Sequence, residues 1–357
     1  MKLVEIRDAI DQLDQQVVAL LRRRMECVLQ AEKHKGDAQD VAREEAILAH
    51  VTSQTSPLLD KAFLLRLYQS ILAESKELQK KHLELVGFGG EHGSFGEIAA
   101  QAFVRGVAPI PCADFQDVFS CVSNGELEYG VVPVENSLEG SVAEVNDLLI
   151  ATDLHIVAEV AIPIHHHLLV LPGVGRQEIR SVYSHPQALG QCRAFLTRNK
   201  LEPRPFHNTA GAARWLAQEQ HRSAGVIASH LAAALYGLQV VEAEIEDHPG
   251  NATRFVFISR YPATGAANKC TIAFSTPHRV GALSDVIRLF AENKINLTRI
   301  ESRPIRGNLG VFAFLLDFQG KPDDPAVKKT LDGVRKAAMT FKNLGFYPEA
   351  AVSGGAA

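Results

Sequence analysis

The chain has 357 residues, which is enough for two or three domains. Its hydrophobic content of 46% and mean hydropathy of −0.01 are typical of a globular protein that buries a core in each domain. The net charge of −4, with both signs interspersed, gives no basic patch for nucleic acid or an anionic membrane. No apolar run approaches the roughly 20 residues that span a bilayer, and the charged N-terminus lacks the apolar core of a signal peptide. We therefore expect a cytoplasmic protein that binds neither nucleic acid nor membrane.

Two groups of residues are potential metal ligands. The five cysteines are odd in number, scattered and without C-x-x-C spacing: Cys27, Cys112, Cys121, Cys192 and Cys270. This pattern predicts reduced thiols and favours neither a disulfide framework nor a zinc site. In the run His165-His166-His167 the outer two residues share a strand face, with no third ligand at useful spacing. We expect a structural or pocket-lining role there, and no metal or other cofactor.

Residues 1–82 are predicted to be helical. Apolar residues recur at helical spacing from residue 3 to residue 28, and nothing breaks the pattern before Gly36. One helix of over thirty residues exceeds the usual length of about 11–12, so we expect it to pack against a partner chain. Two further helices are predicted, one from about residue 40 and one from about 58 to 81.

Several cations on these helices could hold a small anion. Arg24 and Lys35 are eleven positions apart, close to three full turns, so they share a helix face. Arg7 lies roughly 25 Å from Arg24 along the same helix, at ~1.5 Å per residue. It can serve the same site only from an antiparallel partner protomer. A solvated basic face explains the spacing equally well.

Residues 6–14, 20–24, 35, 40–44 and 75–79 together resemble the all-helical chorismate mutases. A Claisen rearrangement needs a compact conformer and hydrogen-bond donors at the breaking ether, and these residue types supply them. The link between Lys35 and Asp40 is very short compared with many relatives. The resemblance implies that Arg7 of a partner, Arg24 and Arg43 engage the two carboxylates. It also implies that Asp40 and Glu44 lie near the ring hydroxyl. Lys35 and Gln79 would bond the ether oxygen, and Ser75 would complete the pocket.

Residues 83–262 alternate between strand-like and helical runs, which predicts parallel α/β sheets in two small lobes around a cleft. Helix starts near residues 93, 184, 208 and 229 carry glycine, serine or asparagine. Ordinary capping explains each of them separately. Facing a cleft together, they would offer backbone N–H groups to a dicarboxylate.

Two short motifs in this region carry candidate chemistry. Glu135 and Asn136 follow a strand, at the edge where an open α/β sheet places ligand groups, although a turn explains them equally well. Thr253 and Arg254 stand at the mouth of a strand-like run. The hydroxyl can donate to a departing group, and the guanidinium can hold a carboxylate or form an ordinary salt bridge.

These motifs resemble prephenate dehydratase over residues 93–95, 131–140, 184–192, 228–238 and 251–255. The resemblance implies a fold like the periplasmic binding proteins, with Thr253 as the catalytic hydroxyl. Glu135, Asn136, Ser184, Gln191, Thr209 and Arg254 would bind substrate. We expect concerted loss of carbon dioxide and water, with Glu135 or His185 supplying the proton through Thr253. Gly96 and Asn208 depart from the commoner family residues and could alter carboxylate binding.

Residues 268–348 are predicted to follow a βαββαβ order. Two segments, Gly281-Ala282-Leu283 and Glu301-Ser302-Arg303-Pro304, resemble the phenylalanine-binding segments of ACT domains fused to prephenate dehydratases. A plain glycine at a helix start and a solvated strand end are the alternatives. Domains of this family pair edge to edge, so the resemblance places the effector at a subunit interface.

The expected protein is therefore a bifunctional enzyme of phenylalanine biosynthesis with three domains, 1–82, 83–262 and 268–348. It would rearrange chorismate to prephenate, convert prephenate to phenylpyruvate, and be inhibited by L-phenylalanine. We expect a homodimer or higher homo-oligomer whose mutase site is shared between protomers. Two alternatives stay open: a dehydratase that prefers arogenate, and a non-catalytic amino-acid sensor derived from this enzyme.

Overall fold

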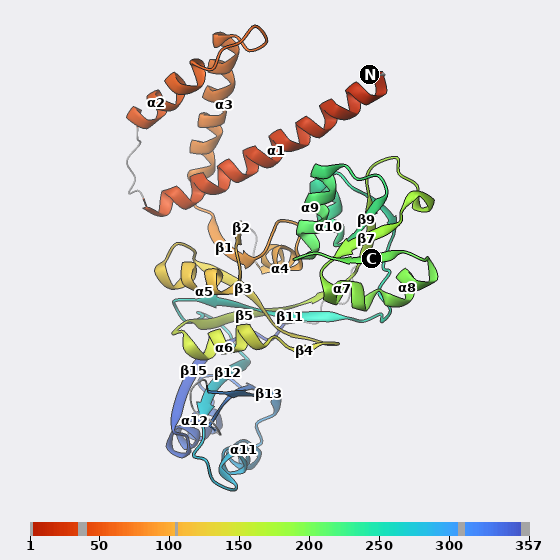
Figure 1. The fold of residues 1–357 in the computed structure, drawn as a ribbon. Helices are drawn as coiled ribbons and strands as arrows, with labels where there is room; N and C mark the ends of the chain where they lie inside the picture. The colour runs from red at the N-terminus through yellow and green to blue at the C-terminus, as the bar shows by residue number, and fades with distance from the viewer. Residues whose placement is uncertain (1–2, 35–40, 104–105, 306–310, 351–357) are drawn as a thin grey trace. The chain divides into compact units, whose positions relative to one another are not determined.

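The computed structural model describes residues 3–34, 41–103, 106–305 and 311–350 (Figure 1). The predicted site residues Lys35 and Asp40 lie outside these ranges. The chain divides into two compact units, one of Met1–Leu85 with Gly106–Ala108, and one of Val86–Arg105 with Pro109–Ala357. Among the described residues, no helix is both long and apolar enough to cross a membrane.

The first unit holds the three predicted helices, α1 (Leu3–His34), α2 (Val41–Thr52) and α3 (Lys61–Gln79). Asp60 caps α3 by accepting a hydrogen bond from the Phe63 backbone N–H at 2.7 Å. The α3 helix packs against both α1 and α2, and Leu29, Leu64 and Leu72 form the buried contacts. The apolar residues along the first two-thirds of α1 stay exposed within this chain: Leu3, Ile6, Ile10, Leu13, Val17, Val18 and Leu20.

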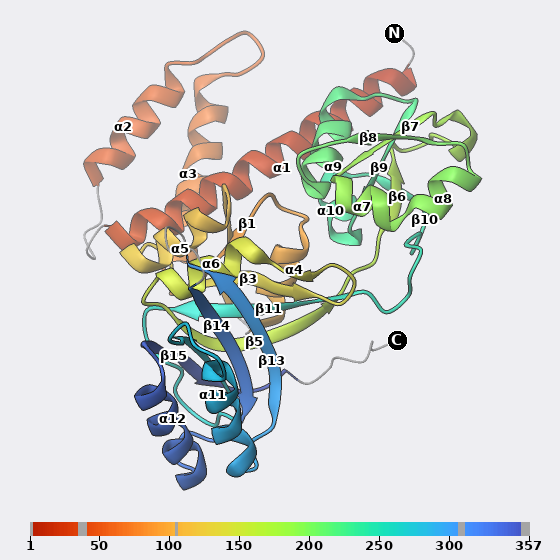
Figure 2. The ribbon, with the colours of Figure 1, turned by 60° about the horizontal axis from the view of Figure 1, so that its bottom comes forward.

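The second unit begins with a six-stranded sheet of order β2-β1-β3-β11-β5, with β4 on the edge of β3. Its strands are β1 (Glu84–Gly89), β2 (Val107–Cys112), β3 (Tyr129–Asn136), β4 (Gly140–Ser141), β5 (His155–Pro163) and β11 (Ala252–Ser259). The helices α4 (Phe95–Phe103), α5 (Phe115–Asn124) and α6 (Ala143–Ala151) pack against this sheet. Strand β1 runs parallel to β3, whereas β11 runs antiparallel to both of its neighbours (Figure 2).

A second sheet, of order β10-β6-β9-β7-β8, forms the other lobe. Its elements are β6 (His167–Val170), the 3₁₀ turn η1 (Arg176–Glu178), β7 (Ser181–Ser184), α7 (Pro186–Gln191), α8 (Arg193–Arg198), β8 (Glu202–Pro205), α9 (Thr209–Glu219), β9 (Ala224–Ala228), α10 (His230–Tyr236) and β10 (Gln239–Glu242). The helical run that follows His185 is thus divided into two helices, which meet at Cys192.

The expectation of parallel sheets was wrong in part, because both sheets are mixed. In the second lobe β6 is antiparallel to β9 and β10, while β7 is parallel to β8 and β9. The physical reason is the path of the chain. It leaves the first lobe after β5, builds the second lobe, and returns as β11 beside β5, so the return strand runs in the opposite direction.

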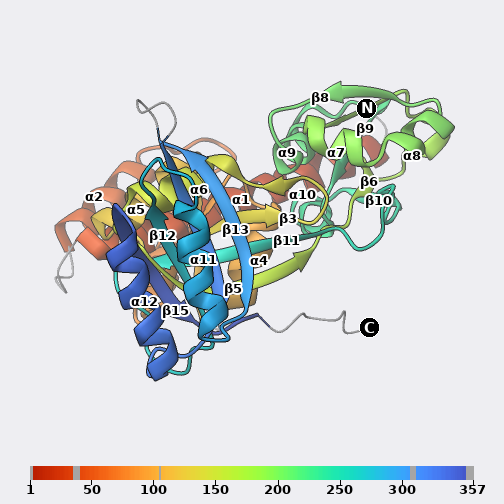
Figure 3. The same ribbon diagram turned by 90° about the horizontal axis from the view of Figure 1, so that it is seen from below.

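The C-terminal part has the predicted βαββαβ order: β12 (Lys269–Ser275), α11 (Ala282–Glu292), β13 (Leu297–Pro304), β14 (Phe312–Gln319), α12 (Pro325–Ala337) and β15 (Thr340–Tyr347). The sheet order is β13-β14-β12-β15, and all its pairs are antiparallel. Helices α11 and α12 lie side by side on one face of the sheet (Figure 3). Phenylalanines fill the layer between helices and sheet, among them Phe274, Phe290 and Phe318.

Candidate functional sites

The structure brings Thr253 and Asn136 together although 117 positions separate them in the chain. They are register partners on β11 and β3, and each side chain is only 9% exposed. The Asn136 Nδ2 group donates to Thr253 Oγ1 at 2.9 Å and to Asn251 Oδ1 at 2.8 Å. Because the threonine oxygen accepts this bond, its own hydrogen stays available for a second partner.

The other end of the Asn136 amide fixes its orientation. Its oxygen accepts hydrogen bonds from the backbone N–H groups of Leu138 and Glu139 at 2.9 and 3.0 Å. Both amide functions are therefore engaged, and the NH₂ group points toward Thr253 by necessity.

A chain of polar side chains continues from this pair into the second lobe. Asn251 donates to Gln191 Oε1 at 3.3 Å, and the same oxygen lies 2.9 Å from His166 Nε2. Gln191 in turn donates to Glu139 at 3.3 Å. Burial lowers the pKa of His166, so its imidazole is held neutral, and its Nδ1 atom is buried without a hydrogen-bond partner. The hydrogen-bonded chain thus links the two lobes.

Two members of this hydrogen-bonded series, Asn251 and His166, had no assigned catalytic or substrate-binding role in the sequence-based site. Asn251 immediately precedes β11, outside the strand, and its side chain reaches Asn136 from a position 115 residues later in the chain. His166 was expected to be structural or pocket-lining, and the structure leaves both roles open. Its contact with Gln191 spans 25 positions, and no local pattern in the sequence predicts it.

A cavity of about 660 Å³ lies between the lobes. It is lined by Asn136, Glu139, Gly140, Ser141 and Val142 from the first lobe and by His185, Pro186, Gln187 and Gly190 from the second. Asn136 lines the cavity and also bonds Thr253, whereas Thr253 is not itself among the lining residues. His185 begins α7, where its Nδ1 accepts from the Gln187 N–H at 3.3 Å.

Ser184 and Thr209 occupy different environments. The Ser184 hydroxyl is fully buried and donates to the Ile227 carbonyl at 2.6 Å, which joins β7 to β9. Thr209 is half-buried at the start of α9, where Asn208 is the capping residue and accepts from the Gly211 N–H at 2.5 Å. Their predicted contacts with substrate stay predictions.

Glu135 and Arg254 lie on the opposite faces of their strands from Asn136 and Thr253, as strand alternation requires. The guanidinium of Arg254 is 12% exposed, and its three nitrogens contact three carboxylates: Nε lies 2.6 Å from Glu135, Nη1 2.8 Å from Glu159 and Nη2 2.7 Å from Asp317. Burial opposes the charge of this group, but Asp317 and the other anionic neighbours raise its pKa above its ordinary value. The geometry favours the salt-bridge alternative over a free carboxylate clamp.

This ionic cluster joins strands β3, β5 and β11 to the βαββαβ domain. Asp317 is on β14 and is 1% exposed, and it also accepts from Thr271 at 2.9 Å. Lys269 on β12 lies 2.9 Å from Glu159 on β5, and Arg299 on β13 lies 3.4 Å from Glu135 on β3. The cluster is defined by three cations (Arg254, Lys269, Arg299) and three anions (Glu135, Glu159, Asp317), so its formal charges cancel.

In the helical unit the structure pairs Arg24 with Ser75. The Arg24 Nη1 group donates to the buried Ser75 hydroxyl at 2.6 Å, and that hydroxyl donates to the Ile71 carbonyl at 2.7 Å. Gln79 lies one turn beyond Ser75, and its Nε2 donates to the Val28 carbonyl at 3.4 Å. Arg24, Ser75 and Gln79 thus share one side of the α1–α3 packing.

The remaining described mutase residues are not gathered there. Arg7 and Arg43 are exposed, and Glu44 pairs with Lys76 at 2.8 Å. At ~1.5 Å per residue, Arg7 is roughly 25 Å from Arg24 on the same helix. One chain therefore supplies only part of the predicted pocket.

In the βαββαβ domain a cavity of about 290 Å³ opens at the start of α11. It is lined by the residues 276–279 and 281–284 with Phe312 and Phe314. Gly281 has a φ of +85°, a left-handed conformation that favours glycine, and a Cβ there would meet nothing within 4 Å. The backbone turn, and not a shortage of space, is therefore the reason for glycine.

The second predicted effector segment lies on the neighbouring strand β13. Ser302 and Pro304 are register partners of Phe314 and Phe312, so this strand runs alongside the cavity without lining it. Arg303 is held by the carboxylate of Asp147 at 2.7 Å, which raises the pKa of the guanidinium. Within the described residues of one chain, the two segments are adjacent and do not meet around one pocket.

Comparison with known proteins identifies three successive segments of the chain. Family models match in order: chorismate mutase type II over residues 6–80, prephenate dehydratase over 86–263 and the ACT domain over 271–335. A bifunctional chorismate mutase/prephenate dehydratase of Stutzerimonas stutzeri is 34% identical over 363 residues, covering 98% of both chains. The chain belongs to the family of bifunctional chorismate mutase/prephenate dehydratases.

Two further relatives cover the last two domains. An arogenate dehydratase/prephenate dehydratase of Arabidopsis thaliana is 37% identical over 275 residues, covering 74% of this chain and 72% of the relative. The crystal structure of a prephenate dehydratase from Arthrobacter aurescens in complex with L-Phe superposes with a TM-score of 0.69 at 31% identity, covering 74% of this chain and 89% of that one.

Proposed function

We propose that the helical domain rearranges chorismate to prephenate, that the two-lobed domain converts prephenate to phenylpyruvate, and that L-phenylalanine inhibits through the ACT domain. The observation that carries the dehydratase assignment is the buried hydrogen bond from Asn136 to Thr253 beside the cavity between the lobes. A pure sensor would need no such oriented hydroxyl, so the non-catalytic alternative is disfavoured.

In the dehydratase site, the Thr253 hydroxyl donates its hydrogen to the hydroxyl that leaves the prephenate ring. Loss of carbon dioxide supplies the electron pair that completes the aromatic ring, and the departing hydroxyl takes a proton to leave as water. His185 and Glu139 are the titratable residues that line the cavity, and either could supply that proton. Glu135, proposed from the sequence for the same task, is engaged by Arg254 at 2.6 Å.

Substrate binding in this domain uses the amide-rich edge of the cavity. Gln191 presents an amide fixed by its neighbours, while Asn136, whose amide is already engaged, lines the cavity and orients Thr253. Ser184 stands at the end of β7 and Thr209 at the start of α9. His166 acts as a positioning residue, because it fixes the Gln191 amide that leads through Asn251 to the catalytic pair.

In the mutase site, Arg24 and Ser75 bind a carboxylate of chorismate, and Gln79 with Lys35 donates to the ether oxygen as it gains negative charge. Arg43 and Glu44 of α2, together with Asp40, complete the pocket. Arg7 enters from the α1 helix of a second copy, because it is too distant from Arg24 in its own chain. The exposed apolar stripe on α1 supports this pairing, since burial between two copies removes it from water.

L-phenylalanine binds at the cavity beside Gly281, Ala282 and Leu283, and the segment Glu301-Ser302-Arg303-Pro304 of a neighbouring ACT domain completes the site. The support is the small size of the cavity, its two phenylalanine side chains and the exposed edge strand β13. The related structure from Arthrobacter aurescens was solved in complex with L-Phe.

Arg254 transmits the state of the ACT domain to the dehydratase site. It follows Thr253 directly in β11, and its guanidinium is held by Asp317 of the ACT sheet. A shift of β14 on effector binding would therefore act on the backbone of the catalytic threonine.

A dehydratase that prefers arogenate is the second candidate, favoured by the 37% identity to the plant arogenate dehydratase/prephenate dehydratase. The test is the kcat/KM of the purified protein for prephenate and for arogenate. We expect the value for prephenate to be higher by at least tenfold, and a higher value for arogenate would overturn the substrate assignment. A cytoplasmic location remains part of the proposal, since chorismate and prephenate are both soluble metabolites.

A further inference from the structure

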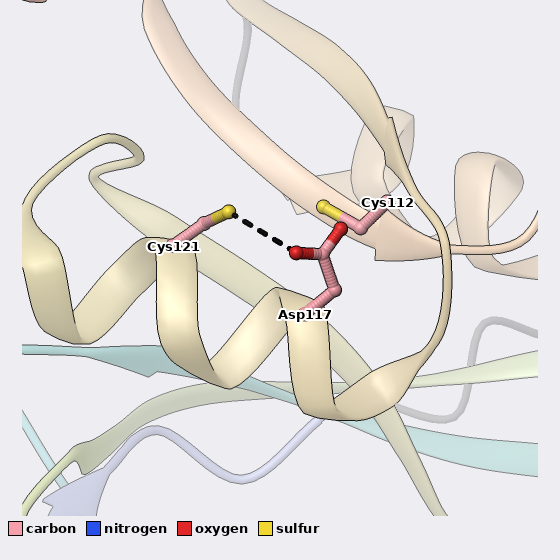
Figure 4. Close-up of side chains that lie close together, drawn as sticks. All are labelled: Cys112, Asp117 and Cys121. Carbon is pink, nitrogen blue, oxygen red and sulfur yellow. Dashed lines mark hydrogen bonds between the residues drawn. The ribbon is translucent and has the colours of Figure 1, made fainter.

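A cluster of two cysteines and an aspartate lies outside both candidate active sites, at the end of β2 and on α5. The potential ligand atoms of Cys112, Asp117 and Cys121 all lie within 4.8 Å of one another (Figure 4). Asp117 and Cys121 are four positions apart and share one helix face, the spacing by which a helix offers two ligands to one ion. Cys112 faces them from the end of the preceding strand.

We propose that this cluster is a binding site for a thiophilic divalent cation of the zinc class, with Cys112 Sγ, Cys121 Sγ and one Asp117 oxygen as ligands. This inference is independent of the two catalytic activities. The odd cysteine count and the absence of C-x-x-C spacing argued against a zinc site in the sequence. The missed signal is a strand-end cysteine followed by a carboxylate and a thiol one helical turn apart.

The distances are compatible with a tetrahedral ion after small side-chain rotations. Two sulfurs bound at about 2.3 Å in tetrahedral geometry lie about 3.8 Å apart, so the largest required closure is roughly 1 Å. The Cys121 sulfur already lies 3.8 Å from Asp117 Oδ1. The other carboxylate oxygen accepts from the Ala113 N–H at 3.0 Å, which holds Asp117 in place while Oδ1 remains directed at the thiol.

The electrostatic environment favours a cation over a disulfide. The Asp117 carboxylate lies 3.8 Å from the Cys121 sulfur, so negative charge is already placed beside the thiols. Thiol–disulfide exchange needs a thiolate, which this negative charge opposes. A bound cation reverses that opposition, because it stabilises both thiolates and the carboxylate at once.

A fourth ligand position can be filled from the same segment. The Glu126 carboxylate lies close to the Cys121 thiol, just beyond the end of α5. Glu126 or a water molecule would complete four-coordination. The Cys121 side chain is half-buried and Cys112 is 5% exposed, so an ion can reach the site from the Cys121 side.

The test is a titration of the metal-free, reduced full-length protein with Co²⁺, whose thiolate charge-transfer absorption reports coordination by cysteine. We expect one equivalent to bind, Zn²⁺ to displace it, and affinity to rise with pH because two thiols must lose protons. Cys121→Ser and Asp117→Asn should each weaken binding at least tenfold, whereas Cys27→Ser, at an exposed cysteine of the helical unit, should leave it unchanged. Absent charge-transfer absorption, or absorption unaltered in Cys121→Ser, would overturn the proposal.

A second measurement does not depend on the variants folding. Zn²⁺ at one equivalent should protect Cys121 of the unmodified protein from alkylation, as mapped by mass spectrometry of its peptides, and should raise the Tm. Equal alkylation with and without Zn²⁺ contradicts the site. A Cys112–Cys121 disulfide that forms under mild oxidation despite equimolar Zn²⁺ would also overturn it, in favour of a redox pair.

Discussion

Thr253 is the residue on which the dehydratase chemistry depends. Its oxygen accepts from Asn136, whose own orientation is fixed by two backbone N–H groups, so the hydroxyl hydrogen has a defined direction before substrate binds. Preorganised donors of this kind lose little free energy to reorientation at the transition state.

Thr253→Val keeps the volume of the side chain and removes the hydroxyl. We expect kcat for phenylpyruvate formation to fall by roughly 10²–10⁴-fold, the range for loss of a positioned proton donor. Thr253→Ser restores the hydroxyl and should recover most of the activity, and mutase turnover should be unchanged in both variants. Steady-state assays with prephenate and with chorismate measure the two activities, and equal losses of both would contradict separate sites.

His166 should make the stability of the fold pH-dependent. Burial lowers its folded pKa below the ordinary 6.5, against the smaller opposing effects of Gln191 and Glu246. Its contribution to stability is therefore full above pH 6.5 and is lost as the pH falls through the lowered folded pKa. His165 also faces this imidazole, and His167 shifts in the same direction because of burial and His230.

Urea unfolding at a series of pH values measures this dependence. The free energy of unfolding of the wild-type protein should decline below pH 6.5, and His166→Gln should show a shallower decline because the contribution of His166 is removed. An identical dependence of the unfolding free energy on pH in wild type and variant would show that His166 does not contribute to it.

Among the elements, α3 carries Ser75 and Gln79 of the proposed mutase pocket. Ser75 and Ser70 offer a matched comparison on this helix, because each hydroxyl donates to the carbonyl four residues earlier, while only Ser75 also accepts from Arg24. A hydrogen bond to a charged group contributes about 1.5–3 kcal/mol.

Ser75→Ala should therefore lower mutase kcat/KM roughly 10- to 100-fold, whereas Ser70→Ala should leave it unchanged. Gln79→Ala should also lower it, mainly through kcat, since this donor acts on the developing ether charge. Assays of chorismate disappearance give the result, and wild-type rates in Ser75→Ala and Gln79→Ala would rule out the proposed pocket.

Most elements could be predicted from periodicity alone, because the apolar residues of α1 recur at helical spacing and the residues of β13 alternate between half-buried and exposed. The mixed sheets could not, since strand direction depends on where the chain crosses between lobes and returns as β11. Residue types and short motifs similarly indicated Thr253 and Asn136, but their contact joins strands 117 positions apart. For the same reason the sequence could not predict the environment of Arg254, because its partners come from three separate strands of two domains.

Across the whole molecule, the ionic cluster around Arg254 is the proposed link between regulation and catalysis. Asp317 is the ACT-side anion of this cluster and is almost fully buried. Removing one partner of a buried ion pair leaves an uncompensated charge and typically costs about 3–5 kcal/mol.

Asp317→Asn should lower the free energy of unfolding by about this amount and should weaken inhibition by L-phenylalanine more than it lowers uninhibited dehydratase activity. Asp332→Asn, at an exposed position of α12, is the matched control and should change unfolding by less than about 0.5 kcal/mol. Urea unfolding and inhibition curves provide both readouts. Unchanged inhibition in a folded Asp317→Asn protein would show that effector binding reaches the active site by another route.

The central claim is that one chain carries two separate active sites that act in sequence. It is tested most directly by incubating purified Thr253→Val with chorismate and following chorismate, prephenate and phenylpyruvate together. The account predicts that chorismate is consumed at the wild-type rate, prephenate accumulates and almost no phenylpyruvate forms. Phenylpyruvate at the wild-type rate, or chorismate left unconsumed by a folded variant, would contradict it.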